Sequence, residues 1–401
     1  MQESPAYKSN HEEVAKALEE GIFYAEAVSN IAHCKDKQFG PFTSQARVTF
    51  VGDTHPAFHG NVVKAVASAK RTYPHIMKSL QSIKPDRFDD LETKIEQVQR
   101  HSDNIIELTI HAPLAAQQYK PGQFFCLQNF ETYAPIIENT RLQTEPLAMR
   151  CAGIDREKGT ISLMVMQQGA SSRLCSIFRP GDPISLMGPT GTKTNIPNGG
   201  ETIMIIGNNL AAADIRTVAP VLKEAGNKVL YVGNFQHQNE IYRQSELEAA
   251  TDAIVWITTE GEPIKKNRPQ DYSATGELLE VLINSTIALE EVTSVIIVGD
   301  YKLIRKIQDA RKGILKQYSP KFTASIHGPM QCMLKGVCAQ CLQWQIDPKT
   351  GERTKAVFSC SWQDQPLDIV DIDNLQERLS QNRLQEVLNN LWVESLLTIK
   401  G

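Results

Sequence analysis

The sequence predicts a mixed β and α/β fold, with an antiparallel β-barrel, a doubly wound parallel α/β domain and a small C-terminal segment rich in cysteine. Three observations predict it. Short alternating strands occupy the chain from Lys94 to about Ile196, and strands alternate with helices from Glu201 to Gly328. Four of the eight cysteines fall within 29 consecutive positions, 332–360. A chain of 401 residues is long enough for two or three domains.

Composition excludes several classes of protein. Hydrophobic residues make up 41% and charged residues 22%, which is typical of globular proteins and not of disordered or fibrous ones. Lys and Arg total 42 against 46 Asp and Glu, so no overall basic field exists to bind nucleic acid. The first residues, MQESPAYKSNHEE, lack the basic and apolar regions of a signal peptide. The longest aliphatic stretches, such as Thr202–Ile206, are far shorter than the roughly 20 residues that span a bilayer. We therefore expect a cytoplasmic protein with no membrane span and no nucleic-acid partner.

The sequence of residues 1–88 predicts a small segment of helices and one strand. A helical pattern covers Glu12–Ala25, and Arg47–Asp53 is a short strand that ends in Gly-Asp. A helix is expected to begin at Asn61, and Pro74 and Pro85 bracket a further short helix.

Residues 89–198 predict the barrel. Ile106, Leu108 and Ile110 alternate with polar residues, and Ile161–Met166 follows a turn. A helix near Ser171–Ile177 interrupts the strands.

Residues 199–328 predict the parallel α/β domain, because strands and helices alternate along them. The expected strands are Thr202–Ile206, Lys228–Val232, Ala253–Thr258 and Ser294–Val298, and the expected helices lie near Ala211–Glu224, Glu277–Leu282 and Lys302–Leu315. The tail, 369–401, is amphipathic from Asp371 to Leu397, and it either packs on its own domain or docks on a partner.

The cysteine segment, 329–368, has the spacing Cys332-x5-Cys338-x2-Cys341-x18-Cys360. Three thiolates in one loop and a fourth from a later segment can surround a single 2Fe-2S cluster. Gly336 inside the loop would let the backbone approach the sulfurs. The second interpretation is a structural zinc site, which normally pairs two Cys-x2-Cys units, of which only one is present here. The third interpretation is that the four thiols bind no metal.

From Lys94 to Asp368 the chain resembles the electron-transfer subunit of dihydroorotate dehydrogenase, a member of the ferredoxin-NADP reductase superfamily. The resemblance is strongest in the segment 328–341, Gly-Pro-Met-Gln-Cys-Met-Leu-Lys-Gly-Val-Cys-Ala-Gln-Cys, and in Ser359-Cys360. The first cysteine interval is x5 here where that subunit has x4. The resemblance implies a flavin-binding barrel, a domain that binds NADH or NADPH, and a 2Fe-2S cluster.

The flavin strand of this superfamily carries Arg-x-Tyr/Phe-Ser. The corresponding positions here hold Glu145, Leu147 and Ala148, which cannot make the same side-chain contacts and leave the backbone of the strand available to the flavin. The resemblance implies FAD-binding positions at Pro146, Leu147, Ala148, Met149 and Arg150. Arg150 and Arg173 are cations that either neutralise the flavin diphosphate in place of the missing arginine or are solvated surface residues.

A second flavin element is the segment 169–172, Gly-Ala-Ser-Ser, which opens a helix. Small residues at a helix N-terminus expose N–H groups to phosphate oxygens, although Ser is also a common helix cap. The superfamily order implies that Gly169, Ser171 and Ser172 bind the flavin.

The nucleotide positions follow two strands. The glycine-rich turn of the superfamily corresponds to Gly207, Asn208 and Asn209, of which only the glycine is kept. Gly299 and Asp300 lie at the later strand end, where the superfamily closes over nicotinamide. The alternative for both is an ordinary strand-turn-helix junction.

Residues Phe50–Asp53 and the helix after them resemble the last flavin-binding element of the glutamate synthase small-subunit family. The resemblance implies that Asp53 bonds the flavin ribityl chain, and the alternative is that it caps a helix. Residues 1–52 hold no Gly-x-Gly-x-x-Gly unit, which a complete site needs. The chain is therefore the downstream part of a larger flavoenzyme, or completes a site on a separate chain, or keeps this segment for packing.

The leading functional hypothesis is an iron-sulfur flavoprotein oxidoreductase, an NAD(P)H-dependent electron-transfer subunit. It would pass electrons between NAD(P)H, FAD and the 2Fe-2S cluster, and to or from a redox partner protein or an upstream flavoprotein chain in a hetero-oligomer. No acid-base constellation is needed for this chemistry, and we predict no catalytic side chain. The alternatives are a non-catalytic electron-relay or assembly subunit with degenerate nucleotide sites, and a zinc-stabilised binding module.

Overall fold

The structure is a computed structural model, and it describes Ala67 and residues 92–318, 321–326 and 341–400. The chain divides into two units between Arg87 and Phe88, and the barrel and the α/β domain belong to the second. Ala67 is helical, at a position where a helix is expected. The other elements expected before residue 88, and Cys332 and Cys338, lie outside the described residues.

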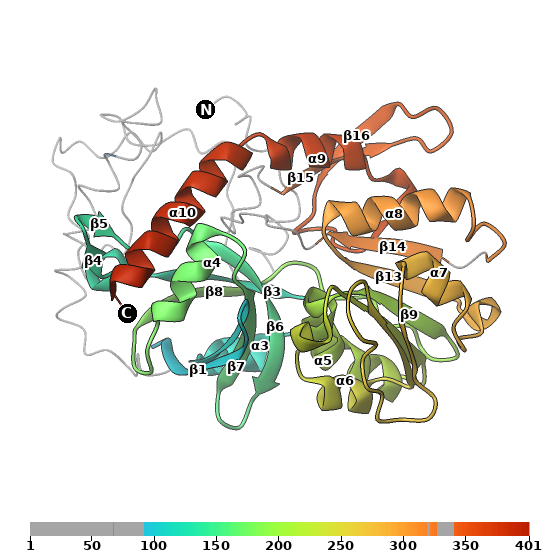
Figure 1. Cartoon of the computed structure of the whole chain (residues 1–401), viewed down its shortest axis with the longest axis horizontal. Helices are drawn as coiled ribbons and strands as arrows, with labels where there is room; N and C mark the ends of the chain where they lie inside the picture. The colour runs from blue at the N-terminus through green and yellow to red at the C-terminus, as the bar shows by residue number, and fades with distance from the viewer. Residues whose placement is uncertain (1–66, 68–91, 319–320, 327–340, 401) are drawn as a thin grey trace, which may run out of the picture. The chain divides into compact units, whose positions relative to one another are not determined.

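An antiparallel barrel forms the first half of the second unit (Figure 1). Its strands, in hydrogen-bonded order, are β1 (Lys94–Ser102), β2 (Ile105–His111), β7 (Thr160–Met166), β6 (Leu147–Asp155), β3 (Phe124–Asn129) and β8 (Ile184–Thr190). The Ile184 amide donates to the Thr93 carbonyl at 3.1 Å, which brings β8 back beside β1. Alternate side chains such as Leu108, Phe125 and Leu163 point inward and are fully buried, because successive residues of a strand face opposite sides.

Short elements complete the barrel. They are α3 (Pro113–Gln118), η5 (Glu131–Tyr133), β4 (Ile136–Ile137), β5 (Thr140–Arg141), α4 (Ala170–Leu174) and η6 (Cys175–Ile177). The helix expected near Ser171–Ile177 is therefore present as α4 and η6.

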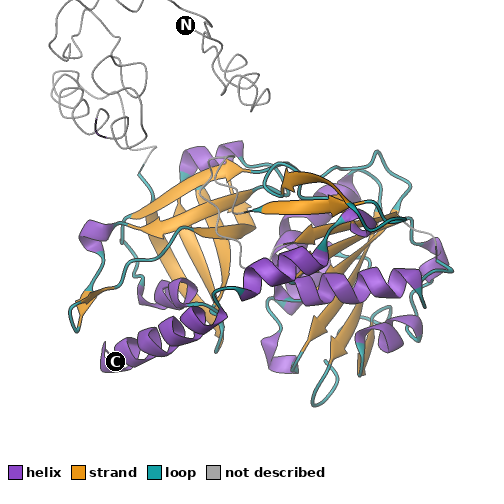
Figure 2. Cartoon of the chain, turned by 90° about the horizontal axis from the view of Figure 1, so that it is seen from above, coloured by secondary structure: helices purple, strands orange, loops and turns teal. Residues whose placement is uncertain are grey.

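A parallel sheet with helices on both faces follows, as expected (Figure 2). Its strand order is β12 (Tyr272–Thr275), β11 (Ala253–Thr258), β10 (Lys228–Phe235), β9 (Thr202–Gly207), β13 (Ser294–Gly299), β14 (Lys321–Ile326) and the antiparallel edge strand β17 (Gln365–Pro366). The helical elements are α5 (Asn209–Glu224), η7 (Gln238–Glu240), α6 (Gln244–Ala250), α7 (Leu278–Ile283), η8 (Leu289–Glu291) and α8 (Tyr301–Lys312).

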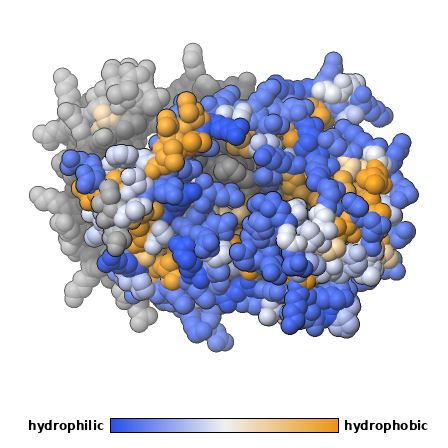
Figure 3. Space-filling view, viewed as in Figure 1, coloured by the Kyte–Doolittle hydropathy of each residue, from blue (hydrophilic) through white to orange (hydrophobic). Residues whose placement is uncertain are grey.

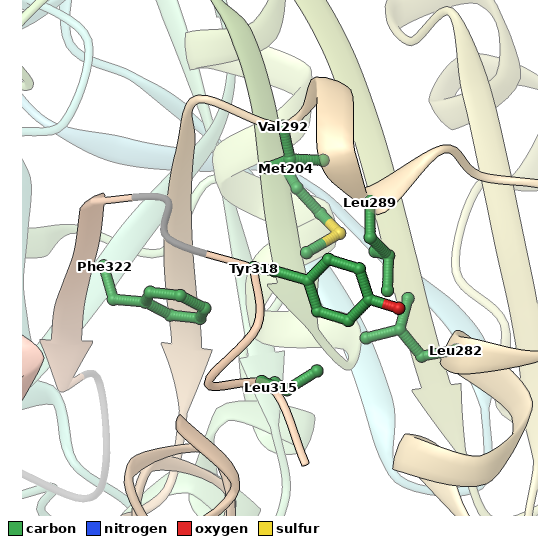
Figure 4. Close-up of a pocket in the computed structure, with 7 residues that line it drawn as sticks. All are labelled: Met204, Leu282, Leu289, Val292, Leu315, Tyr318 and Phe322. Carbon is green, nitrogen blue, oxygen red and sulfur yellow. The ribbon is translucent and has the colours of Figure 1, made fainter. Parts of the chain in front are cut away.

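The two faces of this sheet bury different residues of the same strands. Ile203 and Ile205 of β9 pack with α5, whereas Met204 and Ile206 pack with α7 and α8. Figure 4 shows a gap on the second face, lined by Met204, Leu282, Leu289, Val292, Leu315, Tyr318 and Phe322. Its volume of ≈ 10 Å³ holds about one water molecule, so it is a packing gap and not a ligand site.

The C-terminal part begins with a hairpin of β15 (Leu342–Ile346) and β16 (Arg353–Phe358). The chain continues through β17, η9 (Leu367–Ile369), α9 (Ile372–Ser380) and α10 (Arg383–Lys400). β17 joins the α/β sheet, so the cysteine segment contributes a strand to the preceding domain.

The tail contacts both domains. Ile372 of α9 is buried in the α/β core, whereas Val393 and Leu396 of α10 pack on Leu142 and Leu174 of the barrel. The first half of α10 keeps an exposed apolar stripe of Leu384, Val387, Leu388, Leu391 and Trp392, and apolar side chains gather over α10 in Figure 3. In the described ranges, every helix is too short or too polar to cross a bilayer.

Candidate functional site

The carboxyl ends of β9 and β13 meet at the point where the strand order of the sheet reverses. Helices α5 and α8 leave the sheet from these two strand ends, and in open α/β sheets ligands bind in the crevice at such a switch point. Gly207 is paired in register with Val298, so the predicted nucleotide residues Gly207 and Gly299 lie together. A Cβ atom at Gly207 would lie 2.2 Å from the Val298 carbonyl oxygen, and only glycine fits there.

The polar side chains predicted at this crevice are bonded to the protein itself. Asn208 caps α5 by accepting from the Leu210 amide at 3.1 Å, and Asp300 caps α8 by accepting from the Leu303 amide at 2.9 Å. Asn209 is 3% exposed, and it donates to the Glu240 carbonyl at 2.7 Å. Any contact of these positions with a nucleotide would therefore use backbone groups, such as the N–H groups of the first turn of α5.

The predicted flavin strand is the first half of β6. Met149 points into the barrel core, and Leu147 packs against the same core. Because side chains alternate, Ala148 and Arg150 lie on the opposite, outer face of the strand, the face that packs against α5. Pro146 immediately precedes β6.

Arg150 is 9% exposed, and so it is not a solvated surface arginine. Its Nη1 donates to Asp214 Oδ1 on α5 at 2.7 Å, and its Nη2 donates to Gln363 Oε1 at 2.9 Å. Gln363 Nε2 in turn donates to the Thr192 carbonyl at 3.2 Å. One guanidinium therefore joins the barrel, the α/β domain and the cysteine segment.

Burial raises the pKa of Asp214 to about 6, although the charge and hydrogen bond of Arg150 act to lower it. The Asp214 carboxyl is thus a buried acid whose ionisation depends on Arg150.

The second predicted flavin element begins α4. Ser172 Oγ accepts from the Gly169 amide at 3.0 Å, and Ser171 Oγ accepts from the Glu145 amide at 3.0 Å. Both hydroxyls therefore hold the local backbone. Arg173, the other predicted cation, lies 3.9 Å from Glu394 of α10.

Two of the four predicted metal ligands are described, and they lie together. The Sγ atoms of Cys341 and Cys360 are 3.4 Å apart, which is much longer than a disulfide bond of about 2.05 Å. The hydrogen bond with Cys360 lowers the pKa of Cys341 to about 6, although burial acts to raise it, and Ser359 contributes to the lowering. A thiolate is the form of cysteine that binds metal.

The geometry of this pair fits a shared metal ion. Two thiolates on one tetrahedral ion at ~2.3 Å would lie roughly 3.8 Å apart, so 3.4 Å needs only a small adjustment. Over the described ranges, no group of three or more Cys, His, Asp or Glu side chains is placed to hold a metal. Cys332 and Cys338, which would complete the set, and Asp53 lie outside those ranges.

The cysteine pair is attached to the barrel. The Thr192 amide donates to the Cys360 carbonyl at 3.2 Å, and Thr192 Oγ1 donates to the Ser361 carbonyl at 2.6 Å. Thr192 follows β8, whose neighbour β3 pairs with the predicted flavin strand β6. The sequence pattern gave no sign of this attachment, because Thr192 and Ser361 lie far apart in the chain.

A second polar junction holds the two domains together. Glu107 of β2 is 3% exposed, and it accepts from Arg243 at 2.7 Å and from Arg216 of α5 at 3.3 Å. Burial acts to raise the pKa of Glu107, but the hydrogen bond of Arg243 and the charge of Arg216 outweigh it and lower the pKa to about 2. Glu107 is thus ionised in the folded protein, and it fixes the barrel against α5.

Known proteins resemble the chain in sequence. An uncharacterised protein of Rickettsia prowazekii (strain Madrid E) is 28% identical over 452 residues, which cover 97% of this chain and 55% of that protein. The dihydroorotate dehydrogenase B (NAD(+)) electron transfer subunit homolog of Thermotoga maritima is 24% identical over 161 residues, which cover 40% of this chain and 52% of that protein. The chain therefore spans about half the length of these two relatives. No family model matches it.

Two further known proteins are similar to this chain over most of their own length. The dihydroorotate dehydrogenase B (NAD(+)) electron transfer subunit of Bacillus cereus (strain G9842) is 21% identical over 258 residues, 64% of this chain and 89% of that subunit. The solved NADH-dependent reduced ferredoxin-NADP oxidoreductase has a TM-score of 0.59 at 18% identity, over 74% of this chain and 96% of that one. That likeness shows the same succession of barrel and α/β domain. In sequence the chain is similar to these electron transfer subunits, and in fold it is similar to the solved ferredoxin-NADP oxidoreductase.

Proposed function

We propose that the chain is the electron-transfer part of an iron-sulfur flavoprotein oxidoreductase. Electrons would pass between NAD(P)H, FAD, a 2Fe-2S cluster on Cys332, Cys338, Cys341 and Cys360, and the redox centre of a partner protein. The observation that carries the proposal is the paired thiols of Cys341 and Cys360, attached to the barrel through Thr192. The proposed cluster would thus lie beside the barrel that is proposed to hold the flavin.

The bound groups would supply the redox chemistry, because flavin accepts the two electrons of a hydride and an iron-sulfur cluster carries one at a time. The residues of the chain would position these groups. The backbone around Gly207 and Gly299 would admit the nucleotide at the switch point, and the outer face of β6 around Ala148 would face the flavin. Arg150 would hold the cysteine segment against that strand through Gln363.

The partner is proposed to be a redox protein or an upstream flavoprotein chain in a hetero-oligomer. Two relatives are named as electron transfer subunits of dihydroorotate dehydrogenase B, and subunits of this kind serve a partner chain. The Rickettsia relative aligns with almost all of this chain through about half of its own length, so in that protein the matching part is joined to further sequence. A reducing cytoplasm would keep Cys341 and Cys360 as thiols.

Anaerobic purification and an absorbance spectrum test the proposal. We expect flavin and iron-sulfur bands that both bleach when NADH or NADPH is added. The Cys341→Ser variant should lose the cluster bands and keep the flavin bands, and the Cys175→Ser variant should keep both, because Cys175 is buried in the barrel core. Cluster bands that respond to neither nucleotide would refute the role as a reductase, and a colourless zinc protein would refute the cluster.

A second candidate is a non-catalytic relay or assembly subunit. The observation that favours it is that Arg150, Asn208 and Asn209 are bonded to the protein rather than left facing a cofactor. Under this proposal the purified chain would carry the cluster but would bind neither FAD nor NAD(P)H in a titration followed by calorimetry.

A further inference from the structure

Three buried glutamines form a chain of amides next to the cysteine pair. Gln343 and Gln345 on β15 are each 2% exposed, and Gln365 on β17 is 1% exposed. Gln345 Nε2 donates to Gln365 Oε1 at 3.1 Å, and Gln365 Nε2 donates to Gln343 Oε1 at 2.6 Å. Each amide in this series donates to the next one, so the donor left at the end of the series is the Nε2 group of Gln343.

That donor end is unsatisfied within the part of the chain that the structure describes. Gln343 Nε2 is inaccessible to solvent and has no hydrogen-bond partner there. A buried donor without an acceptor costs about 1–3 kcal/mol, and native proteins seldom leave one unexplained. The arrangement therefore calls for an acceptor beside Gln343.

The position of Gln343 shows which acceptor is near. Cys341 immediately precedes β15, Gln343 is the second residue of that strand, and both residues are buried. Their Cα atoms are thus roughly 7 Å apart, a distance that a glutamine side chain can bridge. Cys360 Sγ lies 3.4 Å from Cys341 Sγ. Neither thiol accepts from Gln343 Nε2 in the structure, so the acceptor would be a sulfur of the cluster held at this pair.

We propose that Gln343 donates an N–H···S hydrogen bond to the iron-sulfur centre at Cys341 and Cys360 and raises its reduction potential. The inference rests on the proposed function and adds a tuning residue to it. Thiolate and sulfide sulfurs carry more negative charge in the reduced cluster, so a donor stabilises the reduced form. Gln345 and Gln365 strengthen the effect, because each amide in a hydrogen-bonded chain polarises the next.

The test uses the full chain with its cluster. Gln343→Met keeps the length of the side chain and removes the donor, so we expect the cluster to assemble and its potential to become more negative in a redox titration followed by electron paramagnetic resonance. The iron-sulfur stretching bands in the resonance Raman spectrum should shift as well. The matched control is Gln345→Met, a change on the same face of the same strand at the other end of the amide chain, and it should shift the potential less.

An unchanged potential in a Gln343→Met protein that keeps its cluster would overturn the inference and leave the proposed function standing. If the variant does not fold, the wild-type protein labelled with ¹⁵N in glutamine side chains gives the answer. A hyperfine coupling between the cluster and an amide ¹⁵N supports the inference, and its absence overturns it. A wild-type protein without an iron-sulfur spectrum refutes the proposed function instead.

Discussion

The Cys341 thiol has an acidity far from that of an ordinary cysteine, because the hydrogen bond with Cys360 lowers its pKa to about 6. A depressed pKa favours the folded state above the unfolded pKa of about 8.5, and the benefit is lost as the pH falls through 6. In the metal-free protein, the ultraviolet absorbance of the Cys341 thiolate should therefore appear well below the pH of about 8.5 at which an ordinary cysteine ionises. The difference between the spectra of the wild type and of Cys341→Ser, recorded from low to high pH, measures it. Cys175, whose pKa burial raises to about 12, should stay protonated in the same range, and a Cys341 thiolate that appears only above the ordinary pKa would contradict the prediction.

Single residues also show where reading the sequence succeeds and where it fails. The register of two strands brings Gly207 and Gly299 together, and that follows from the strand-helix alternation alone. In contrast, alternation in Leu342–Ile346 would point the apolar residues inward, yet the structure buries Gln343 and Gln345. Their burial depends on Gln365, a partner twenty or more positions away, which no local pattern contains.

Among the elements, α10 joins the C-terminus to the barrel through a few apolar contacts. Leu396 is 1% exposed in the cluster with Leu142 and Leu174, whereas Leu391 of the same helix is 59% exposed. Leu396→Ala should lower the free energy of unfolding by about 2–4 kcal/mol, because it removes buried methyl groups and leaves a cavity. Leu391→Ala should change it by less than about 0.5 kcal/mol. Chemical denaturation followed by circular dichroism measures both, and equal effects would show that α10 does not pack as described.

The elements themselves were largely predictable, and their partners were not. The expected helices near Ala211–Glu224 and Lys302–Leu315 are α5 and α8, because long amphipathic patterns are strong local signals. The tail was expected either to pack on its own domain or to dock on a partner. The structure shows packing within the chain, divided between two domains, with α9 in the α/β core and α10 on the barrel. An apolar stripe predicts that a helix packs on another surface but does not identify that surface, and much of the α10 stripe is exposed in the structure.

Across the whole second unit, the Glu107 junction holds the barrel and the α/β domain in one orientation. The pKa of Glu107 is about 2 in the folded protein against 4.5 ordinarily, so its charge stabilises the folded state by about 3 kcal/mol at neutral pH. This contribution is complete above pH 4.5 and is lost as the pH falls towards 2. Glu107→Gln should thus be less stable than the wild type by about this amount at pH 7 and equal to it near pH 2, in urea denaturation at each pH. The control is Glu96→Gln, at an ion pair with His111 near the surface, which should lower the free energy of unfolding by less than about 1 kcal/mol. If the difference in stability between Glu107→Gln and the wild type does not change with pH, the charge of Glu107 does not stabilise the fold.

The hydrogen bonds of Arg150 join the barrel, the α/β domain and the cysteine segment, so their loss should destabilise all three parts. Arg150→Met removes the cation beside the buried Asp214 carboxylate, and breaking a buried pair costs about 3–5 kcal/mol. The double variant Arg150→Met/Asp214→Leu should recover most of this loss, because it leaves no carboxylate buried. In either variant Gln363 loses the donor from Arg150, so hydrogen–deuterium exchange should become faster in residues 341–368.

The matched control for this junction is Arg268→Met. It breaks a comparable pair with the buried Asp271 at 2.7 Å, but that pair lies within the α/β domain alone. It should destabilise the protein without faster exchange in residues 341–368. If Arg150→Met and Arg268→Met change the exchange of that segment equally, Arg150 does not fix the cysteine segment. If only Arg150→Met speeds the exchange, then Arg150, which the sequence predicted to contact the flavin, holds the proposed cluster beside the barrel.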